Sequence, residues 1–179
     1  MSLKKGVTWT ILGNGMAAGS QWIVLIAIAK FGGMSQAGSY ALVLSVVSPM
    51  LILSGMSLRP VYVSSNHNID FQIYCGVRYA LIFLGLLCSW GLLVALTEID
   101  LHLMLLLLLI WLIKASDMIS DIYYCEPYKN KQIDVIGRSS FIRGCIFSLA
   151  FIVVYYSVGD VILSLAAVAI ALITYTFVV

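Results

Sequence analysis

The 179-residue chain is 62% hydrophobic and only 10% charged, with a mean hydropathy of +1.05. Because a soluble globular chain carries about 25% charged residues, this composition excludes a soluble domain and predicts a single all-α polytopic membrane domain over residues 1–179. The net charge of +2 selects no function, but the placement of the charges predicts the topology.

The first apolar segment, residues 7–29, follows a short basic start. A signal peptide is one interpretation, because residues 17–20 (AAGS) loosely resemble a cleavage site. The apolar run before them is short, however, and apolar sequence resumes directly after them. A retained first helix therefore fits better.

Polar and small residues interrupt this first helix. Thr10, Asn14 and Gln21 share one face, where they either form hydrogen bonds between helices or line a cavity. Gly15 and Gly19 form a GxxxG pattern, which allows another helix to approach closely.

A glycine-rich turn is predicted over residues 31–38, followed by a second helix over 37–58. Pro49 lacks a backbone donor, so it predicts a kink in that helix. A polar connection over 64–72 leads to a third helix over 74–96.

The fourth helix must extend beyond its apolar part. Residues 101–113 are apolar, but 13 residues at ~1.5 Å each reach only about 20 Å, short of the ~30 Å hydrocarbon core. The helix is therefore predicted over 101–122, which places Lys114, Asp117 and Asp121 within the membrane.

These three charged residues fall within an arc of about 60° on one helical face. Such a stripe is expected to face other helices or a wet cavity, with Asp117 the first candidate partner of Lys114. The alternative is that Asp121 lies at the membrane boundary and that Lys114 extends towards it.

A polar loop over 123–137 precedes a fifth helix over 138–157, and Gly159 and Asp160 form a turn before a sixth helix over 161–179. Six crossings place both termini on the same side. The side with more basic residues is expected to be cytoplasmic. With a cytoplasmic N-terminus, the predicted cytoplasmic basic residues are Lys4, Lys5, Arg59, Arg78, Lys129, Lys131, Arg138 and Arg143, against Lys30 alone outside.

The motifs of several functional classes are missing from the sequence. It contains no P-loop, no GxGxxG, no HExxH and no GxSxG, and the four cysteines lack metal-site spacing. His67 and His102 are predicted on opposite sides of the membrane. The sequence therefore predicts no enzyme, no cofactor, no metal site and no nucleic-acid partner.

The candidate ligand-binding residues are polar groups that could meet in the cytoplasmic half of a helix bundle. Arginine presents a planar donor fork suited to phosphate oxygens. The alternative for each arginine is that it anchors a helix end to lipid head groups. The candidates are Arg59, Arg78, Lys114, Asp117, Asp121, Arg143, Asn14 and Gln21.

Three passages resemble a known family. They are LKKGVTWTILGNG (3–15), FGGMSQAGSYALVLSVVSPMLILSGMSLRPV (31–61) and SDIYYCEPYKNKQIDVIGRSSFIRG (120–144). The first resembles the opening helix of the O-antigen flippases, polysaccharide-biosynthesis membrane proteins whose superfamily includes multidrug exporters. The second resembles their first outer loop and second helix, and the third their loop between helices four and five.

The resemblance implies a transporter with two lobes of six helices around a central cavity, in the bacterial cytoplasmic membrane. Its implied substrate is a polyprenyl-diphosphate-linked oligosaccharide. Arg59, Arg78 and Arg143 approximately match basic positions of the family, whereas the Lys114 stripe matches no motif. Members are more than twice as long as this chain, so the resemblance implies an N-terminal lobe that pairs with a second lobe or a second copy. The alternatives are a cation-coupled drug exporter and a non-transporting scaffold of a glycan-assembly complex.

Overall fold

The computed structural model describes residues 3–55, 71–97, 100–129 and 132–178, and every regular element in these ranges is a helix. Five helices contain segments long and apolar enough to cross a membrane. These are α1 (Leu3–Phe31), α2 (Gly33–Gly55), α4 (Phe71–Leu96), α5 (Leu101–Tyr123) and α7 (Ile133–Val158). The predicted all-α polytopic membrane fold is therefore confirmed. The remaining elements are the short α6 (Cys125–Lys129) and α8 (Val161–Val178), an apolar helix shorter than the other five, whose crossing stays a prediction.

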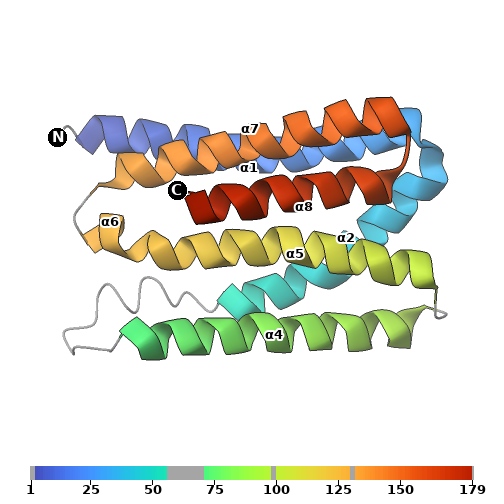
Figure 1. Cartoon of the computed structure of the whole chain (residues 1–179), viewed down its shortest axis with the longest axis horizontal. Coiled ribbons are helices and arrows are strands. Elements are labelled where there is room, and N and C mark those ends of the chain that lie inside the picture. The colour runs from blue at the N-terminus through green and yellow to red at the C-terminus, as the bar shows by residue number, and fades with distance from the viewer. Residues whose placement is uncertain (1–2, 56–70, 98–99, 130–131, 179) are drawn as a thin grey trace.

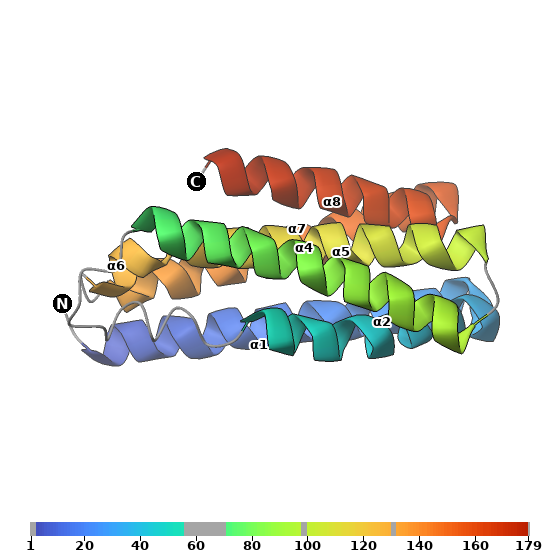
Figure 2. The same ribbon diagram turned by 90° about the horizontal axis from the view of Figure 1, so that it is seen from below.

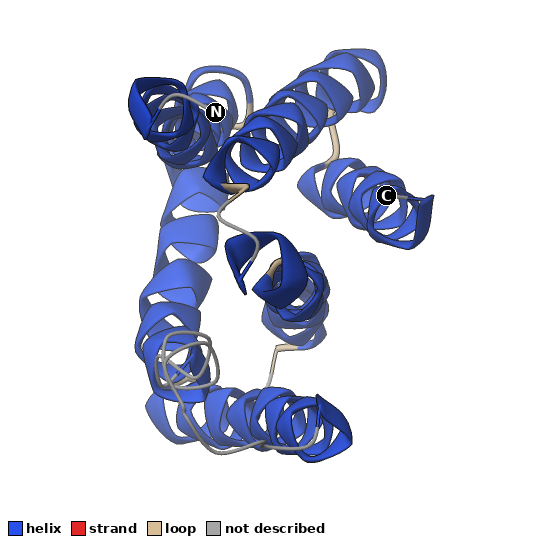
Figure 3. Ribbon diagram, turned by 90° about the vertical axis from the view of Figure 1, so that its left-hand side faces the viewer, coloured by secondary structure: helices blue, strands red, loops and turns tan. Residues whose placement is uncertain are grey.

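The long helices alternate in direction, so the N-terminus and the end of α8 lie towards the same end of the bundle (Figure 1). Helix α5 occupies a central position, in contact with α2, α4 and α8. Figure 2 shows α5 between α1 and α8 in the turned view. Figure 3 looks along the bundle from the end that carries both termini and shows helices alone in the described part. The assignment of this end to the cytoplasm stays a prediction.

The predicted glycine-rich turn over residues 31–38 is wrong in its extent. Only Gly32 separates α1 from α2. Gly33 adopts a left-handed φ of 81°, which a residue without a Cβ reaches at little cost, and this lets the chain reverse within one residue. The following residues, from Met34 onwards, are then free to continue as helix.

The predicted polar loop over 123–137 is also partly wrong. It contains α6, and α7 begins at Ile133 rather than at residue 138. Asp134 lies in the first turn of α7, where a carboxylate is favoured by the positive end of the helix dipole. The chain is helical through Pro49.

The apolar core occupies one half of the bundle, towards the α1–α2 and α7–α8 turns. Its largest fully buried side chains come from α1, α2, α5, α7 and α8, and α4 contributes Leu93. At this end, Tyr155 of α7 also donates a hydrogen bond to Gln36 of α2. Members of this core include Val24, Ile28, Tyr40, Val43, Leu106, Leu107, Trp111, Phe151 and Leu165. The other half, towards the termini, contains the charged side chains described below.

Helices α1 and α7 pack more extensively than any other pair in the described chain, because glycines let their backbones meet. A Cβ on Gly13 would collide with the carbonyl oxygen of Gly137, and a Cβ on Gly137 would collide with the backbone of Trp9. The GxxxG pattern of Gly15 and Gly19 has no such role, since a Cβ at either position would meet nothing within 4 Å. The prediction that Gly15 and Gly19 allow the close approach is therefore wrong, because Gly13 and Gly137 allow it instead.

Candidate functional site

A polar cluster joins α5, α7 and α8 around the buried Arg143. Its Nη2 and Nε donate to Oδ1 of Asp117 at 2.7 Å and 3.1 Å. The same guanidinium donates to the hydroxyl of Ser116 at 2.7 Å, to that of Thr176 at 2.8 Å and to that of Ser120. Charge-assisted hydrogen bonds of this kind are about twice as strong as neutral ones, so this cluster fixes α7 and α8 against α5.

A second arginine joins α2, α4 and α5. Arg78 of α4 is 4% exposed and donates from Nη2 to Oδ2 of Asp121 at 3.3 Å. Its Nη1 donates to the carbonyl oxygens of Gly55 at 2.8 Å and Ser54 at 3.4 Å, at the C-terminal end of α2. These carbonyls carry the negative end of the helix dipole, so a cation stabilises them.

A cavity of about 190 Å³ lies between α1, α5 and α7 in the polar half. Four charged side chains from α5 and α7 line it, together with the amide of Gln21 from α1. Its lining residues include Ser20, Gln21, Lys114, Asp117, Ser120, Asp121, Tyr124, Arg143 and Phe147. A separate, much smaller space of about 10 Å³ lies beside Lys114 towards the apolar core, among Tyr40, Leu44 and Phe147.

Lys114 is the cavity cation with the weakest ion pair. Its Nζ lies 4.0 Å from Oδ2 of Asp117, whereas Arg143 holds the same carboxylate at 2.7 Å. Arg78 pairs with Asp121 from outside the cavity lining. Each of the two arginines thus forms a close ion pair with an aspartate, and the positive charge of Lys114 is not balanced by a further carboxylate of its own in the described part of the chain. Counted over the described residues alone, the cavity and its ion pairs therefore carry one net positive charge.

The predicted site residues divide into three groups. Gln21, Lys114, Asp117, Asp121 and Arg143 come together around the cavity. Arg78 and Asn14 do not line it, because Arg78 is buried between α2, α4 and α5, and Asn14 is on the exposed surface of α1. Arg59, like His67, lies outside the described residues.

These contacts correct one interpretation drawn from the sequence and add a closer partner to another. Arg78 and Arg143 do not anchor helix ends to lipid head groups, because both are buried and paired with aspartates. The predicted pair of Lys114 and Asp117 is present, with Nζ and Oδ2 4.0 Å apart, but Arg143 holds the same carboxylate at 2.7 Å. The sequence suggested Lys114 because it lies one turn away on the same helix, but an arginine on the neighbouring helix reaches the carboxylate at a shorter distance.

Sequence reasoning missed the hydroxyl groups that surround Arg143. Ser116 and Ser120 lie one turn apart on α5, and each contacts the hydroxyl of Thr176 on α8, at 3.1 Å and 3.3 Å. The signal for the serines was present, because they alternate with Asp117 and Asp121 on the same helix. Nothing in the apolar sequence of α8 indicated that Thr176 would join them.

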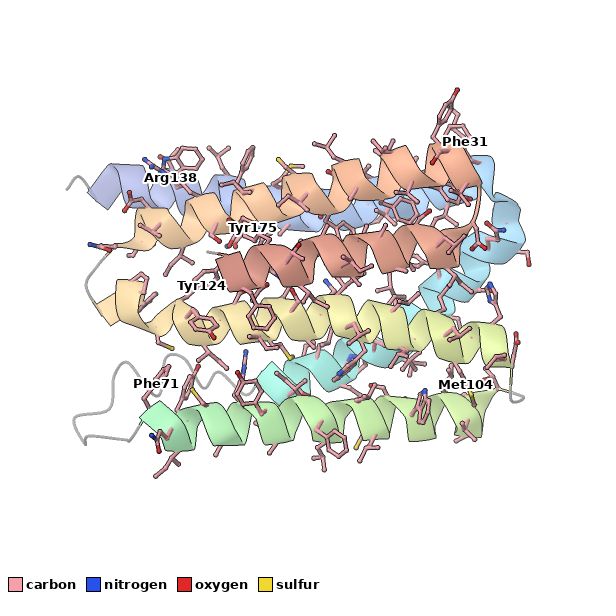
Figure 4. All side chains as sticks on the ribbon, viewed as in Figure 1. Phe31, Phe71, Met104, Tyr124, Arg138 and Tyr175 are labelled. Carbon is pink, nitrogen blue, oxygen red and sulfur yellow. The ribbon has the colours of Figure 1, made fainter. Side chains whose placement is uncertain are left out.

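The polar half also holds aromatic residues from the end of α5 and from α8. Tyr124 and Tyr175 lie at the same end of the bundle as Arg138, opposite Phe31 and Met104 (Figure 4). Arg138 stacks over the ring of Trp9 with its guanidinium carbon 5.1 Å from the ring centre, so a cation–π contact links α7 to α1 at this end. In the described residues, no three His, Cys, Asp or Glu side chains gather into a group that could bind a metal ion.

The fold and the paired charges within it define an all-α, multi-pass membrane protein with a polar cavity at one end of its helix bundle. Comparisons of the chain with protein-family models, with curated proteins and with solved structures find no match. The resemblance to the O-antigen flippases therefore depends on the three sequence passages alone.

Proposed function

We propose that this chain forms one lobe of a carrier that translocates polyprenyl-diphosphate-linked oligosaccharides across the bacterial cytoplasmic membrane. The observation that carries the proposal is Lys114, a cation in the cavity wall. Its nearest carboxylate among the described residues is 4.0 Å away and already held by Arg143. The resemblance of residues 3–15, 31–61 and 120–144 to the flippases supports the substrate class.

The charge balance of the cavity favours an anionic ligand. The side chain of Lys114 is 18% exposed, so its ammonium group is partly desolvated and can be reached from the cavity. Ion pairing is stronger in such a partly dehydrated site than in water. A diphosphate would supply the oxygens that the ammonium lacks, whereas a cationic drug would meet an excess of positive charge.

The shape of the cavity supports a role as part of a larger binding site. It is only partly enclosed by the described helices and lies beside the exposed surface of α1. A second lobe or a second copy of the chain would enclose the open side. This arrangement agrees with a carrier that binds its ligand between two lobes.

Binding of a polyprenyl diphosphate to the full chain in lipid nanodiscs tests the proposal. We expect the diphosphate lipid to bind at least tenfold more tightly than the uncharged polyprenol. Lys114→Gln should weaken diphosphate binding by about tenfold to a hundredfold, because a hydrogen bond to a charged group contributes about 1.5–3 kcal/mol. Lys114→Arg should retain most of the affinity.

Lys30→Gln is the matched control, because Lys30 is an exposed lysine at the opposite end of the bundle. It should leave the affinity unchanged. Equal binding of polyprenol and polyprenyl diphosphate would contradict the proposal. Tight binding of a lipophilic cation, lost in Asp117→Asn, would favour the drug exporter instead.

A further inference from the structure

A second cavity, of about 330 Å³, lies beside the first, between α5, α6, α7 and α8. Its described lining contains four aromatic rings and three aliphatic hydroxyls, and no charged side chain. The lining residues are Ser120, Tyr123, Tyr124, Pro127, Val135, Ser139, Tyr175, Thr176 and Phe177. The walls of the two cavities share Ser120 and Tyr124.

The hydroxyl groups of this second cavity form a connected set. The Ser139 hydroxyl lies 2.7 Å from the Tyr124 hydroxyl and 3.2 Å from the Tyr175 hydroxyl. Burial raises the pKa of Tyr124 above its ordinary value, because the phenolate is disfavoured away from water. Tyr124 therefore stays protonated near neutral pH and can both donate and accept a hydrogen bond.

Aromatic rings beside uncharged hydroxyls suit a sugar. The C–H faces of a hexose pack on aromatic rings, and its hydroxyls exchange hydrogen bonds with side-chain hydroxyls. The cavity has the volume of roughly ten waters at ~30 Å³ each, which is enough for one sugar ring. Tyrosines that only mark a membrane surface turn towards head groups, as the exposed Tyr128, which is not among the residues of this lining, can. Tyr124 and Tyr175 instead direct their hydroxyls inward to Ser139.

We infer that this second cavity binds the first hexose of the lipid-linked glycan, while Lys114 binds the diphosphate. This inference rests on the proposed function. Ser120, in the shared wall, follows Lys114 by six residues, which is ~9 Å along the helix and within the reach of a sugar diphosphate head group. Arg143 stands between the two cavities, with its guanidinium bonded to Ser120 and Thr176.

The test compares two probes on the full chain in nanodiscs: polyprenyl diphosphate, and the same lipid carrying one hexose. The hexose should increase the affinity of the unmodified chain about tenfold. Tyr175→Phe and Ser139→Ala should each reduce that increase about threefold to tenfold and leave the affinity for the bare diphosphate lipid unchanged. Tyr156→Phe is the matched control, because Tyr156 is exposed at the opposite end of α7, and it should change neither affinity.

The outcomes separate this inference from the proposed function. If the hexose adds no affinity while Lys114→Gln still weakens both probes, the sugar site is overturned and the proposed function stands. If Tyr175→Phe weakens both probes equally, Tyr175 supports the fold and the sugar site is again overturned. If neither probe depends on Lys114, the proposed function itself fails. Thermal unfolding of each variant verifies that the chain is folded.

Discussion

Helix α5 carries two aspartates one turn apart, and each pairs with an arginine from a different neighbouring helix. Asp117 pairs with Arg143 of α7 at 2.7 Å, and Asp121 pairs with Arg78 of α4 at 3.3 Å. The residue types are the same, but the surroundings differ. The remaining donors of Arg143 bond to hydroxyl groups at the wall of a cavity, whereas those of Arg78 bond to backbone carbonyls at the end of α2.

The difference shows that the surroundings of an ion pair decide whether its charges only hold helices together or can also meet a ligand. Arg78 donates hydrogen bonds to the carbonyl oxygens at the end of α2 and does not line the cavity, so it contributes to the stability of the fold. The Asp117 side chain is 46% exposed and lines the cavity next to Lys114, so solvent or a ligand can reach it. The Arg78 pair therefore connects helices and reaches the cavity only through Asp121, whereas both members of the Arg143 pair line the cavity.

The largest effect is expected from Arg78→Met, which removes a buried cation from Asp121 and from the α2 carbonyls. Removing one partner of a buried ion pair costs about 3–5 kcal/mol. Arg78→Lys keeps the charge but loses the planar fork, so it should cost less. Equilibrium unfolding in mild detergent measures both. A loss below about 1 kcal/mol in Arg78→Met would show that this arginine is not a structural joint.

The next effect concerns the position of α7, on which the Arg143 pair depends. Gly137→Ala places a methyl group against the backbone of Trp9, and overpacking of this kind costs about 1–3 kcal/mol. The matched control is Gly15→Ala, which meets nothing within 4 Å and should gain up to about 1 kcal/mol from helix propensity. Unfolding measurements in detergent compare the two. Equal losses in both variants would contradict the observed α1–α7 contact.

A smaller loss of stability is expected from Asp117→Asn, about 1–2 kcal/mol. The carboxylate is half exposed, so solvent screens its pairing, and the amide oxygen can still accept from Arg143. Removal of this negative charge should also strengthen binding of polyprenyl diphosphate several-fold, because the cavity then carries a second surplus positive charge. Nanodisc binding measures this gain, and an unchanged or weaker affinity would contradict the charge balance.

The sequence predicted the fold more completely than the site. Hydropathy and length located the membrane helices because a run of apolar residues has few alternatives to a bilayer span. Lys114, Asp117 and Asp121 line one cavity, as their spacing on a single helical face predicted. The predicted length of the turn near Gly33 was wrong, since the left-handed backbone of this glycine shortens the turn in a way that composition does not reveal.

The partners within the site were beyond the reach of the sequence, because they depend on which helices pack together. Lys114, on the same helix, was the candidate partner of Asp117 that the sequence showed. Arg143 lies 26 residues further along the chain, on α7. Similarly, Gly13 rather than Gly15 contacts α7, because the direction of each face is set by the whole α1–α7 packing. A single sequence shows which residues share a face of a helix, but not which other helix packs against that face.

The smallest stability effect, and the sharpest test of the comparison, is expected from Lys114→Gln. A pair at 4.0 Å with a half-exposed carboxylate contributes little, so the loss should stay below about 0.5 kcal/mol. If Asp117 were the main partner of Lys114, the loss would be larger, and a second change at Asp117 would relieve part of it. The contacts instead predict that Lys114→Gln and Asp117→Asn act additively on stability, with a coupling energy below about 0.5 kcal/mol.

A double-mutant cycle of Arg143→Gln with Asp117→Asn should by contrast give a coupling above about 1 kcal/mol, because those side chains share two short hydrogen bonds. Unfolding of the three single and two double variants supplies both cycles. Strong coupling between Lys114 and Asp117 would mean that the ammonium group is engaged by the carboxylate and is not free for an anion. Weak coupling there, together with strong coupling at Arg143, would separate the residue that holds the helices from the residue that is left to bind a ligand.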